Sequence, residues 1–188
     1  MTTAMQRTLA QIEQTGIVPV LRGPSESAAR ELIVALLGNG HRIVEVTLTT
    51  PGALALIAEL ASREDVMVGA GTVLTEAEAV GAIKAGAKFL VSAANPAFLL
   101  PFARERDVLG VPGAATPHEV WTAWVSGAPM VKVFPIARLG GPAYIKDLKG
   151  PFPEIRLMAS GGVTPNDVDA LSAAGCAAVG INAAALVV

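Results

Sequence analysis

Short apolar runs, most of them rich in β-branched residues, recur eight times along the chain, with starts roughly 19 to 26 residues apart. Almost every gap between them has the periodicity of an amphipathic helix. Strands that alternate with helices build a parallel sheet, and eight such units favour closure into a (β/α)8 barrel over an open doubly wound sheet or a solenoid. The eight runs are IVPVL (17–21), IVEVTL (43–48), VMVGAG (66–71), FLVSA (89–93), VLGVPG (108–113), MVKVF (130–134), IRLMAS (155–160) and AAVGIN (177–182).

Capping residues mark where the intervening helices begin. Ser25 and Thr75 precede helical segments directly, and Thr116 and Thr164 do so with a proline in the next position. Most of these segments end at a glycine, which is the residue that best closes a helix. The helix-capping residues therefore agree with the repeating strand–helix unit.

The two ends of the chain depart from the repeat. The first fifteen residues predict an additional helix, with Leu9 and Ile12 packing across one end of the barrel. The chain reaches Val188 soon after the eighth run, so we expect a truncated or missing eighth helix. No linker or low-complexity tract divides the sequence, which predicts a single domain over residues 1–188.

Charge and composition exclude several classes of function. The net charge is -2 with no block of like charge, so we expect no nucleic-acid partner. The apolar runs are far shorter than the ~20 residues that span a bilayer, and we expect no membrane association. A single cysteine, Cys176, and an N-terminus unlike a signal peptide favour a cytoplasmic protein with small-molecule partners. His41 and His118 have no partner at ligand spacing, so we expect no metal.

A pair of charges interrupts two of the apolar runs. Lys132 lies in the middle of residues 130–134, and Glu45 lies within residues 43–48. Alternation along a strand places Glu45 on one face, and inward-facing side chains of a barrel meet in layers, so the two charges can approach each other inside the barrel. The pair is either a structural ion pair or a functional site. Because desolvating two charges costs several kcal/mol each, the pattern favours function.

A desolvated lysine beside a carboxylate is suited to carbon–carbon bond chemistry. Removal from water favours the free amine, which attacks a ketone to form a Schiff base. The iminium withdraws electrons, so a bond one carbon further on can break without a metal, and a carboxylate can move the protons. We therefore predict Lys132 and Glu45 as catalytic residues.

Seven segments in order along the chain form a recognisable set: GIVPVLRG, GNGHRIVEVTLTTPGAL, VGAGTVLT, AGAKFLVS, VPGAATPHEV, VKVFPIARLGGPAYIKDLKGPFPEIRLMASGGVTP and AAGCAAVG. Together they resemble the 2-keto-3-deoxy-6-phosphogluconate aldolase family, which includes the 4-hydroxy-2-oxoglutarate and phosphogalactonate aldolases. The resemblance implies a metal-free class I aldolase that needs no cofactor, cleaves a 2-keto-3-deoxy sugar acid to pyruvate and an aldehyde, and is commonly a homotrimer.

The resemblance also implies roles for individual residues. Lys132 is then the Schiff-base lysine and Glu45 the general acid and base. Thr72 is implied to hydrogen-bond the pyruvyl end of the substrate, and Phe134 to form a wall beside the iminium.

The resemblance further implies an arginine for the substrate carboxylate, and the planar fork of that side chain suits bidentate binding. Some members of the family carry it two residues beyond the E-V-T motif, where this chain has Thr49, and others at the end of the first strand, where it has Arg22. We assign carboxylate binding to Arg22. The alternative is a surface arginine at a strand end.

The expected phosphate site departs from the family pattern. Ser160, Gly161 and Gly162 offer backbone N–H groups at a helix start, although a tight turn would also select glycine. The eighth strand of the family usually ends in a Gly-Ser pair, whereas this chain has Asn182 and Ala183. We therefore include Asn182 among the substrate-binding residues and leave open a phosphorylated or an unphosphorylated aldehyde.

Two other functions fit parts of the sequence. The same barrel could carry a phosphosugar isomerase or epimerase that uses Glu45 as its base. It could also be a non-catalytic assembly subunit, although a buried charge pair has little purpose in a scaffold.

Overall fold

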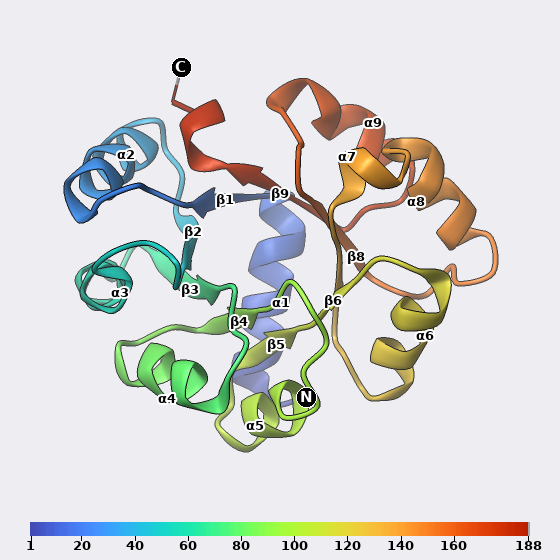
Figure 1. The fold of residues 1–188 in the computed structure, drawn as a ribbon, viewed down its shortest axis with the longest axis horizontal. Helices are drawn as coiled ribbons and strands as arrows, with labels where there is room; N and C mark the ends of the chain where they lie inside the picture. Colours follow the sequence, from blue (N-terminus) through green and yellow to red (C-terminus); the bar gives the residue numbers. More distant parts are fainter. Residues whose placement is uncertain (188) are drawn as a thin grey trace.

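The computed structural model describes residues 1–187, so Val188, the last residue of the predicted domain, lies outside the described residues. Parallel strands form one sheet in the order β5-β4-β3-β2-β1-β9-β8-β7-β6, a nearly closed barrel with helices outside it (Figure 1). All eight apolar runs contribute strands, so the predicted (β/α)8 architecture is confirmed. The strands are β1 (Ile17–Leu21), β2 (Ile43–Thr47), β3 (Met67–Gly71), β4 (Phe89–Val91), β5 (Leu109–Val111), β6 (Gly113–Ala114), β7 (Val131–Val133), β8 (Leu157–Ser160) and β9 (Ala178–Asn182).

Pro112 divides the fifth run into two strands. β5 pairs with β4 on one side, and β6 pairs with β7 on the other. Proline has no N–H to give to a ladder, but its carbonyl still accepts the N–H of Lys132 at 2.8 Å. Because only Pro112 separates β5 from β6, the chain itself joins the two ends of the sheet and closes the barrel.

Helices begin where the capping residues predict. Ser25, Thr75 and Thr116 each accept a backbone N–H at the start of a helix, and Thr164 caps a short 3-10 segment that runs into the next helix. Two helices, rather than one, lie between β7 and β8. The helical elements are α1 (Thr3–Thr15), α2 (Glu26–Gly38), α3 (Ala53–Ala61), α4 (Glu76–Lys84), α5 (Leu99–Glu105), α6 (Pro117–Val125), α7 (Ile136–Leu139), α8 (Pro142–Lys149), η1 (Pro165–Asp167), α9 (Val168–Ala173) and η2 (Ala183–Ala185).

The N-terminal helix α1 covers one end of the barrel, as the sequence predicts. Leu9 and Ile12 are buried and belong to one cluster with Phe89 of β4, Met158 of β8 and Met130, which directly precedes β7. In Figure 1, α1 crosses behind the barrel. This end is closed by apolar side chains, which leaves the opposite end, at the carboxyl ends of the strands, for ligands.

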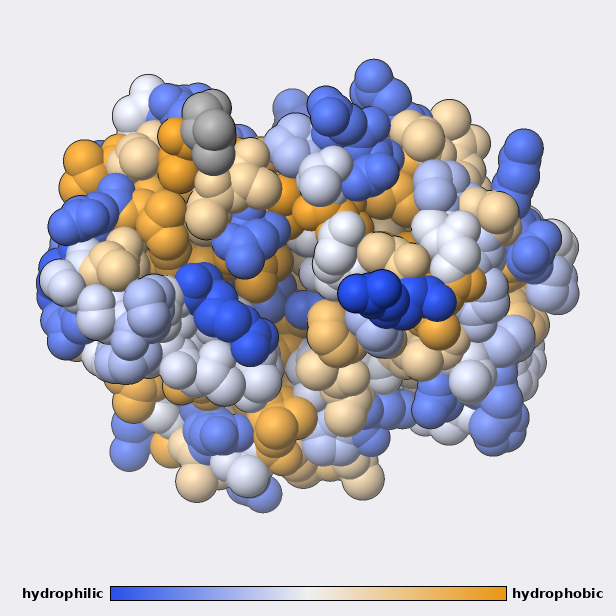
Figure 2. Space-filling model, turned by 45° about the horizontal axis from the view of Figure 1, so that its top comes forward, coloured by the Kyte–Doolittle hydropathy of each residue, from blue (hydrophilic) through white to orange (hydrophobic). Residues whose placement is uncertain are grey.

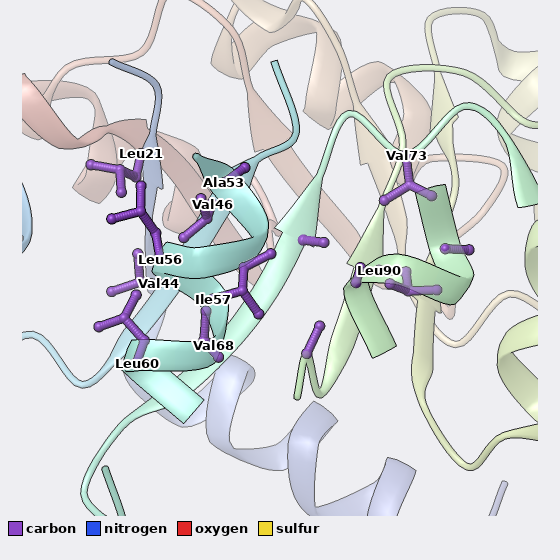
Figure 3. Packing of buried hydrophobic residues seen from close by; sticks show 14 of the residues in the cluster. Leu21, Val44, Val46, Ala53, Leu56, Ile57, Leu60, Val68, Val73 and Leu90 are labelled. Atoms are coloured by element: carbon purple, nitrogen blue, oxygen red, sulfur yellow. The ribbon is translucent and has the colours of Figure 1, made fainter. Parts of the chain in front are cut away.

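A second core layer lies between the barrel and the outer helices. Val44 and Val46 of β2 belong to one cluster with Leu56 and Ile57 of α3 (Figure 3). Ile43, by contrast, belongs to the cluster inside the barrel. The alternation predicted for this strand is therefore observed, and Glu45 lies on the inner face with Ile43.

After β9 the described residues form only the short segment η2, and no α-helix follows it as far as residue 187. Within the described part of the chain, none of the helices is both long and apolar enough to cross a bilayer.

Candidate active site

Two buried charges meet inside the barrel, near its open end. Lys132 Nζ of β7 donates to Glu45 Oε1 of β2 across 3.3 Å. Lys132 is 6% exposed and Glu45 is 0% exposed. The structure thus brings together the two residues that the sequence predicts as catalytic, although 87 positions separate them along the chain.

The position of the Glu45 carboxylate depends on a glycine in the neighbouring strand. A Cβ added at Gly71 would lie 2.8 Å from Glu45 Cδ and closer still to Oε1. Any other residue there would displace the carboxylate. The second oxygen, Oε2, is buried and has no hydrogen-bond partner among the described residues, which is unusual for a buried carboxylate oxygen.

A cavity of about 310 Å³ opens beside the charge pair. In Figure 2 the top of the molecule is turned forward, and hydrophilic and hydrophobic residues are interspersed over the face that it shows. A larger hollow of about 480 Å³ lies on the α1 side of the molecule, away from the pair. Residues of β1, β2, β7, β8 and β9 and of the loops that follow some of these strands line the cavity beside the pair: Val20, Arg22, Glu45, Lys132, Phe134, Ser160, Gly161, Gly162, Val163, Gly180 and Asn182.

Arg22 follows β1 and is the second cationic side chain of the cavity. Its Nη2 donates to Thr72 Oγ1 across 3.4 Å. Thr72 does not line the cavity itself and has a φ of 58°, which is unusual for threonine. Thr72 therefore reaches the site through Arg22, while Thr49, the other position considered for a carboxylate-binding residue, is exposed.

Phe134 forms one wall of the cavity and remains 36% exposed. Its ring centroid lies 5.8 Å from Lys132 Nζ. A Cβ added at Gly161 would lie 2.7 Å from this ring. Gly161 and Gly162 both have positive φ, 94° and 76°. Ring contact and backbone conformation therefore account for the two glycines without a phosphate.

The remaining polar side chains at the far end of the cavity already make hydrogen bonds within the protein. Ser160 Oγ is buried and donates to the carbonyl of Gly180 across 3.2 Å. Asn182 Oδ1 accepts the N–H of Ala184 at 3.0 Å. The side-chain NH2 group of Asn182 is thus the end that can donate to a ligand.

The histidines do not contribute to this cavity. His41 is half-buried in the turn before β2, and burial, together with the nearby Arg42, lowers its pKa. His118 is exposed at the start of α6. Among residues 1–187, no group of three or more His, Cys, Asp or Glu side chains is placed to hold a metal ion.

Sequence reasoning missed three residues of the cavity, Val20, Val163 and Gly180. Alternation would have found two of them, because Val20 precedes Arg22 by two positions and Gly180 precedes Asn182 by two. Gly180 also lies opposite Ser160 in the ladder between β8 and β9.

The barrel, the buried charge pair and the cavity beside it define an enzyme of the (β/α)8 class, whose sites lie at the carboxyl ends of the strands. A family model described as KDPG and KHG aldolase matches residues 9–185. The chain is 37% identical over 153 residues to the 2-dehydro-3-deoxy-phosphogluconate aldolase of Pseudomonas aeruginosa, an overlap of 81% of this chain and 70% of that protein.

Solved structures agree with the family model. The crystal structure of the 2-keto-3-deoxy-6-phosphogluconate aldolase of Zymomonas mobilis has a TM-score of 0.83 at 29% identity and covers 92% of this chain and 85% of its own. KDPG aldolase of Legionella pneumophila, solved with pyruvate captured as a covalent carbinolamine, has a TM-score of 0.80 at 30% identity, with coverages of 88% and 81%. The chain belongs to the KDPG and KHG aldolase family, and the protein is a carbon–carbon lyase.

Proposed function

We propose that this protein is a class I aldolase that cleaves 2-keto-3-deoxy-6-phosphogluconate, 4-hydroxy-2-oxoglutarate, or both, to pyruvate and an aldehyde. The observation that carries the proposal is the 3.3 Å contact between Lys132 Nζ and Glu45 Oε1 beside a cavity that is open to solvent. Family membership supports the reaction class, and the pair supplies the two groups that the reaction needs.

The reaction begins with the transfer of a proton from Lys132 to Glu45, which leaves a free amine beside a carboxylic acid. The amine attacks the C2 ketone of the substrate and forms a carbinolamine. Glu45 returns its proton to the C2 hydroxyl, which leaves as water. The products of this stage are a cationic iminium on Lys132 and a carboxylate on Glu45.

Cleavage uses the same two residues. Glu45 accepts the proton of the C4 hydroxyl, the C3–C4 bond breaks, and its electron pair moves into the iminium to give an enamine. The C4 carbon leaves as the aldehyde. Glu45 then protonates C3, and water hydrolyses the new iminium to release pyruvate and free Lys132.

The other residues of the cavity bind the substrate in this proposal. The exposed guanidinium of Arg22 binds the substrate carboxylate, with Thr72 beside it. The ring of Phe134 shields the iminium from water on one side. Ser160, Gly161, Gly162 and Asn182 face the distal end of the substrate, where a phosphate or a carboxylate would lie.

The wider setting is also part of the proposal. One domain spanning residues 1–188 carries the whole site, and we propose a homotrimer in the cytoplasm that acts on small molecules. The resemblance to the family supports the trimer, and light scattering of the purified protein tests it. The single cysteine supports the reducing compartment.

The test is pyruvate release from three substrates, namely 2-keto-3-deoxy-6-phosphogluconate, its galacto epimer and 4-hydroxy-2-oxoglutarate. We expect the native protein to release pyruvate from 2-keto-3-deoxy-6-phosphogluconate, from 4-hydroxy-2-oxoglutarate, or from both, and Lys132→Ala to release none above background. If neither of these two substrates is cleaved, or if the substrates are epimerised and not cleaved, the proposal is wrong. The ratio of the rates on the phosphorylated and unphosphorylated substrates measures what Asn182 and Ala183 do to the distal site.

A further inference from the structure

Two threonines, Thr47 at the end of β2 and Thr50 three residues beyond it, hold the backbone on both sides of Arg22. Thr47 Oγ1 donates to the carbonyl of Leu21 across 3.2 Å. Thr50 Oγ1 accepts the N–H of Gly23 at 3.4 Å. The two hydroxyl oxygens lie 3.1 Å apart. Thr47 is 0% exposed and Thr50 is 3% exposed, so water does not compete for these bonds.

Donor and acceptor can be assigned in only one way in these three hydrogen bonds. Gly23 N–H must donate to Thr50, and Thr47 donates its single hydroxyl proton to Leu21. The 3.1 Å contact is therefore made by the Thr50 proton, which points to Thr47. The N–H of Gly23 and the two hydroxyls each donate one hydrogen bond, in a series that ends at the carbonyl of Leu21. Buried hydrogen bonds that follow one another in this way strengthen each other.

The two hydroxyls continue the sheet where its ladder stops. β1 ends at Leu21, and its pairing with β2 consists of Val20 with Glu45 and Leu21 with Val46. Arg22 and Gly23 lie beyond the last pair of this ladder. The hydroxyls of Thr47 and Thr50 take the place of the next ladder bonds and fix the Cα of Arg22 relative to β2, the strand that carries Glu45.

We propose that Thr47 and Thr50 are positioning residues that set the direction of the Arg22 side chain toward the substrate carboxylate. This inference rests on the proposed function, in which Arg22 binds that carboxylate. A bidentate bond requires the guanidinium plane and the carboxylate plane to coincide. A fixed Cα restricts the positions that the long, exposed side chain of Arg22 can reach, and so favours this alignment. Loss of either hydroxyl therefore weakens carboxylate binding without a direct contact to the substrate.

The primary variant is Thr50→Val, which keeps the shape of the side chain and removes both hydrogen bonds. We expect the pyruvate concentration that gives half-maximal trapping with cyanoborohydride to rise about tenfold, and the maximal trapping rate to change less than twofold. Thr50→Ser restores the hydroxyl and should restore the native value. Thr8→Val makes the same change at a buried site on α1, at the closed end of the barrel, and should leave trapping unchanged.

Two further measurements separate positioning from a general loss of structure. Methyl pyruvate lacks the carboxylate charge, so Thr50→Val should not alter its half-maximal concentration. In an Arg22→Ala background, Thr50→Val should have no further effect on pyruvate, since the two residues act on one interaction. An equal loss for pyruvate and methyl pyruvate, or additive effects of the two substitutions, would overturn the positioning role.

The outcome also distinguishes this inference from the proposed function. If the native protein traps pyruvate and Thr50→Val traps it with the same half-maximal concentration, only the role of the threonines is wrong. If the native protein traps no pyruvate at all, the proposed function is wrong and the positioning role falls with it.

Discussion

Replacing Gly71 with alanine tests how closely the catalytic carboxylate is held. Gly71 has no positive φ, so its backbone accepts alanine, and the three heavy atoms nearest to the new Cβ all belong to Glu45. The new Cβ would lie 2.8 Å from Glu45 Cδ. Ordinary carbon contacts begin near 3.5 Å, so the carboxylate must move by on the order of 1 Å. Such a shift breaks the contact with Lys132 and should lower kcat about 100-fold.

The assay is pyruvate release at saturating substrate, measured beside the free energy of unfolding in urea. Overpacking of this kind costs about 1 to 3 kcal/mol, so Gly71→Ala should remain folded at 25 °C. Gly38→Ala is the matched control, since a Cβ there meets no heavy atom within 4 Å. A folded Gly71→Ala protein with a kcat within threefold of the native value would refute the reasoning, because the carboxylate would then tolerate displacement.

Three other predictions concern charge, burial and packing. Glu45→Gln keeps the size of the side chain but not the proton transfer, so kcat in the pyruvate-release assay should fall about 100-fold to 10,000-fold. Burial raises the pKa of the Cys176 thiol to about 11. The unfolded thiol ionises first, so stability in urea should fall as pH rises from about 9 to 11, and Cys176→Ala should remove this slope. Leu9→Ala on α1 should lower the free energy of unfolding, measured in urea, by about 2 to 5 kcal/mol and leave kcat unchanged. An unchanged free energy of unfolding would contradict this.

The dependence of stability on acidic pH gives a separate test, at the start of α6. Glu119 accepts the N–H groups of Ala115 and Thr116 at 2.8 Å each, and these bonds lower its pKa below the ordinary value of 4.5. The stabilisation is present above pH 4.5 and is lost as the pH falls through the lowered pKa. Glu119→Gln should therefore be less stable than the native protein at pH 7 and approach it in stability near pH 3, and a constant difference would contradict this.

The strands were predictable because burial on both faces of a parallel sheet demands apolar runs. Capping boxes made the starts of α4 and α6 equally visible, since Thr75 and Thr116 are each followed three residues later by a glutamate. The division of the fifth run was not predictable. Pro112 is evident in the sequence, but its effect depends on which neighbours pair with each half, and pairing is a property of the closed sheet.

The centre of the site was predictable for a physical reason. A charge inside an apolar run needs a partner, and alternation indicated which faces of β2 and β7 carry Glu45 and Lys132. The surroundings were less accessible. Thr72 adopts a left-handed backbone conformation that nothing in its residue type suggests. Thr50 contacts Gly23 across the gap between two strand ends, a contact that no sequence period encodes.

The most direct test of the account is to identify the residue that forms a covalent bond with pyruvate. The protein is treated with pyruvate and sodium borohydride, digested, and analysed by mass spectrometry. We expect one reduced pyruvate on the peptide that contains Lys132, and none in the Lys132→Ala protein. An adduct on a different lysine, or no adduct in a preparation that releases pyruvate from its substrate, would contradict it.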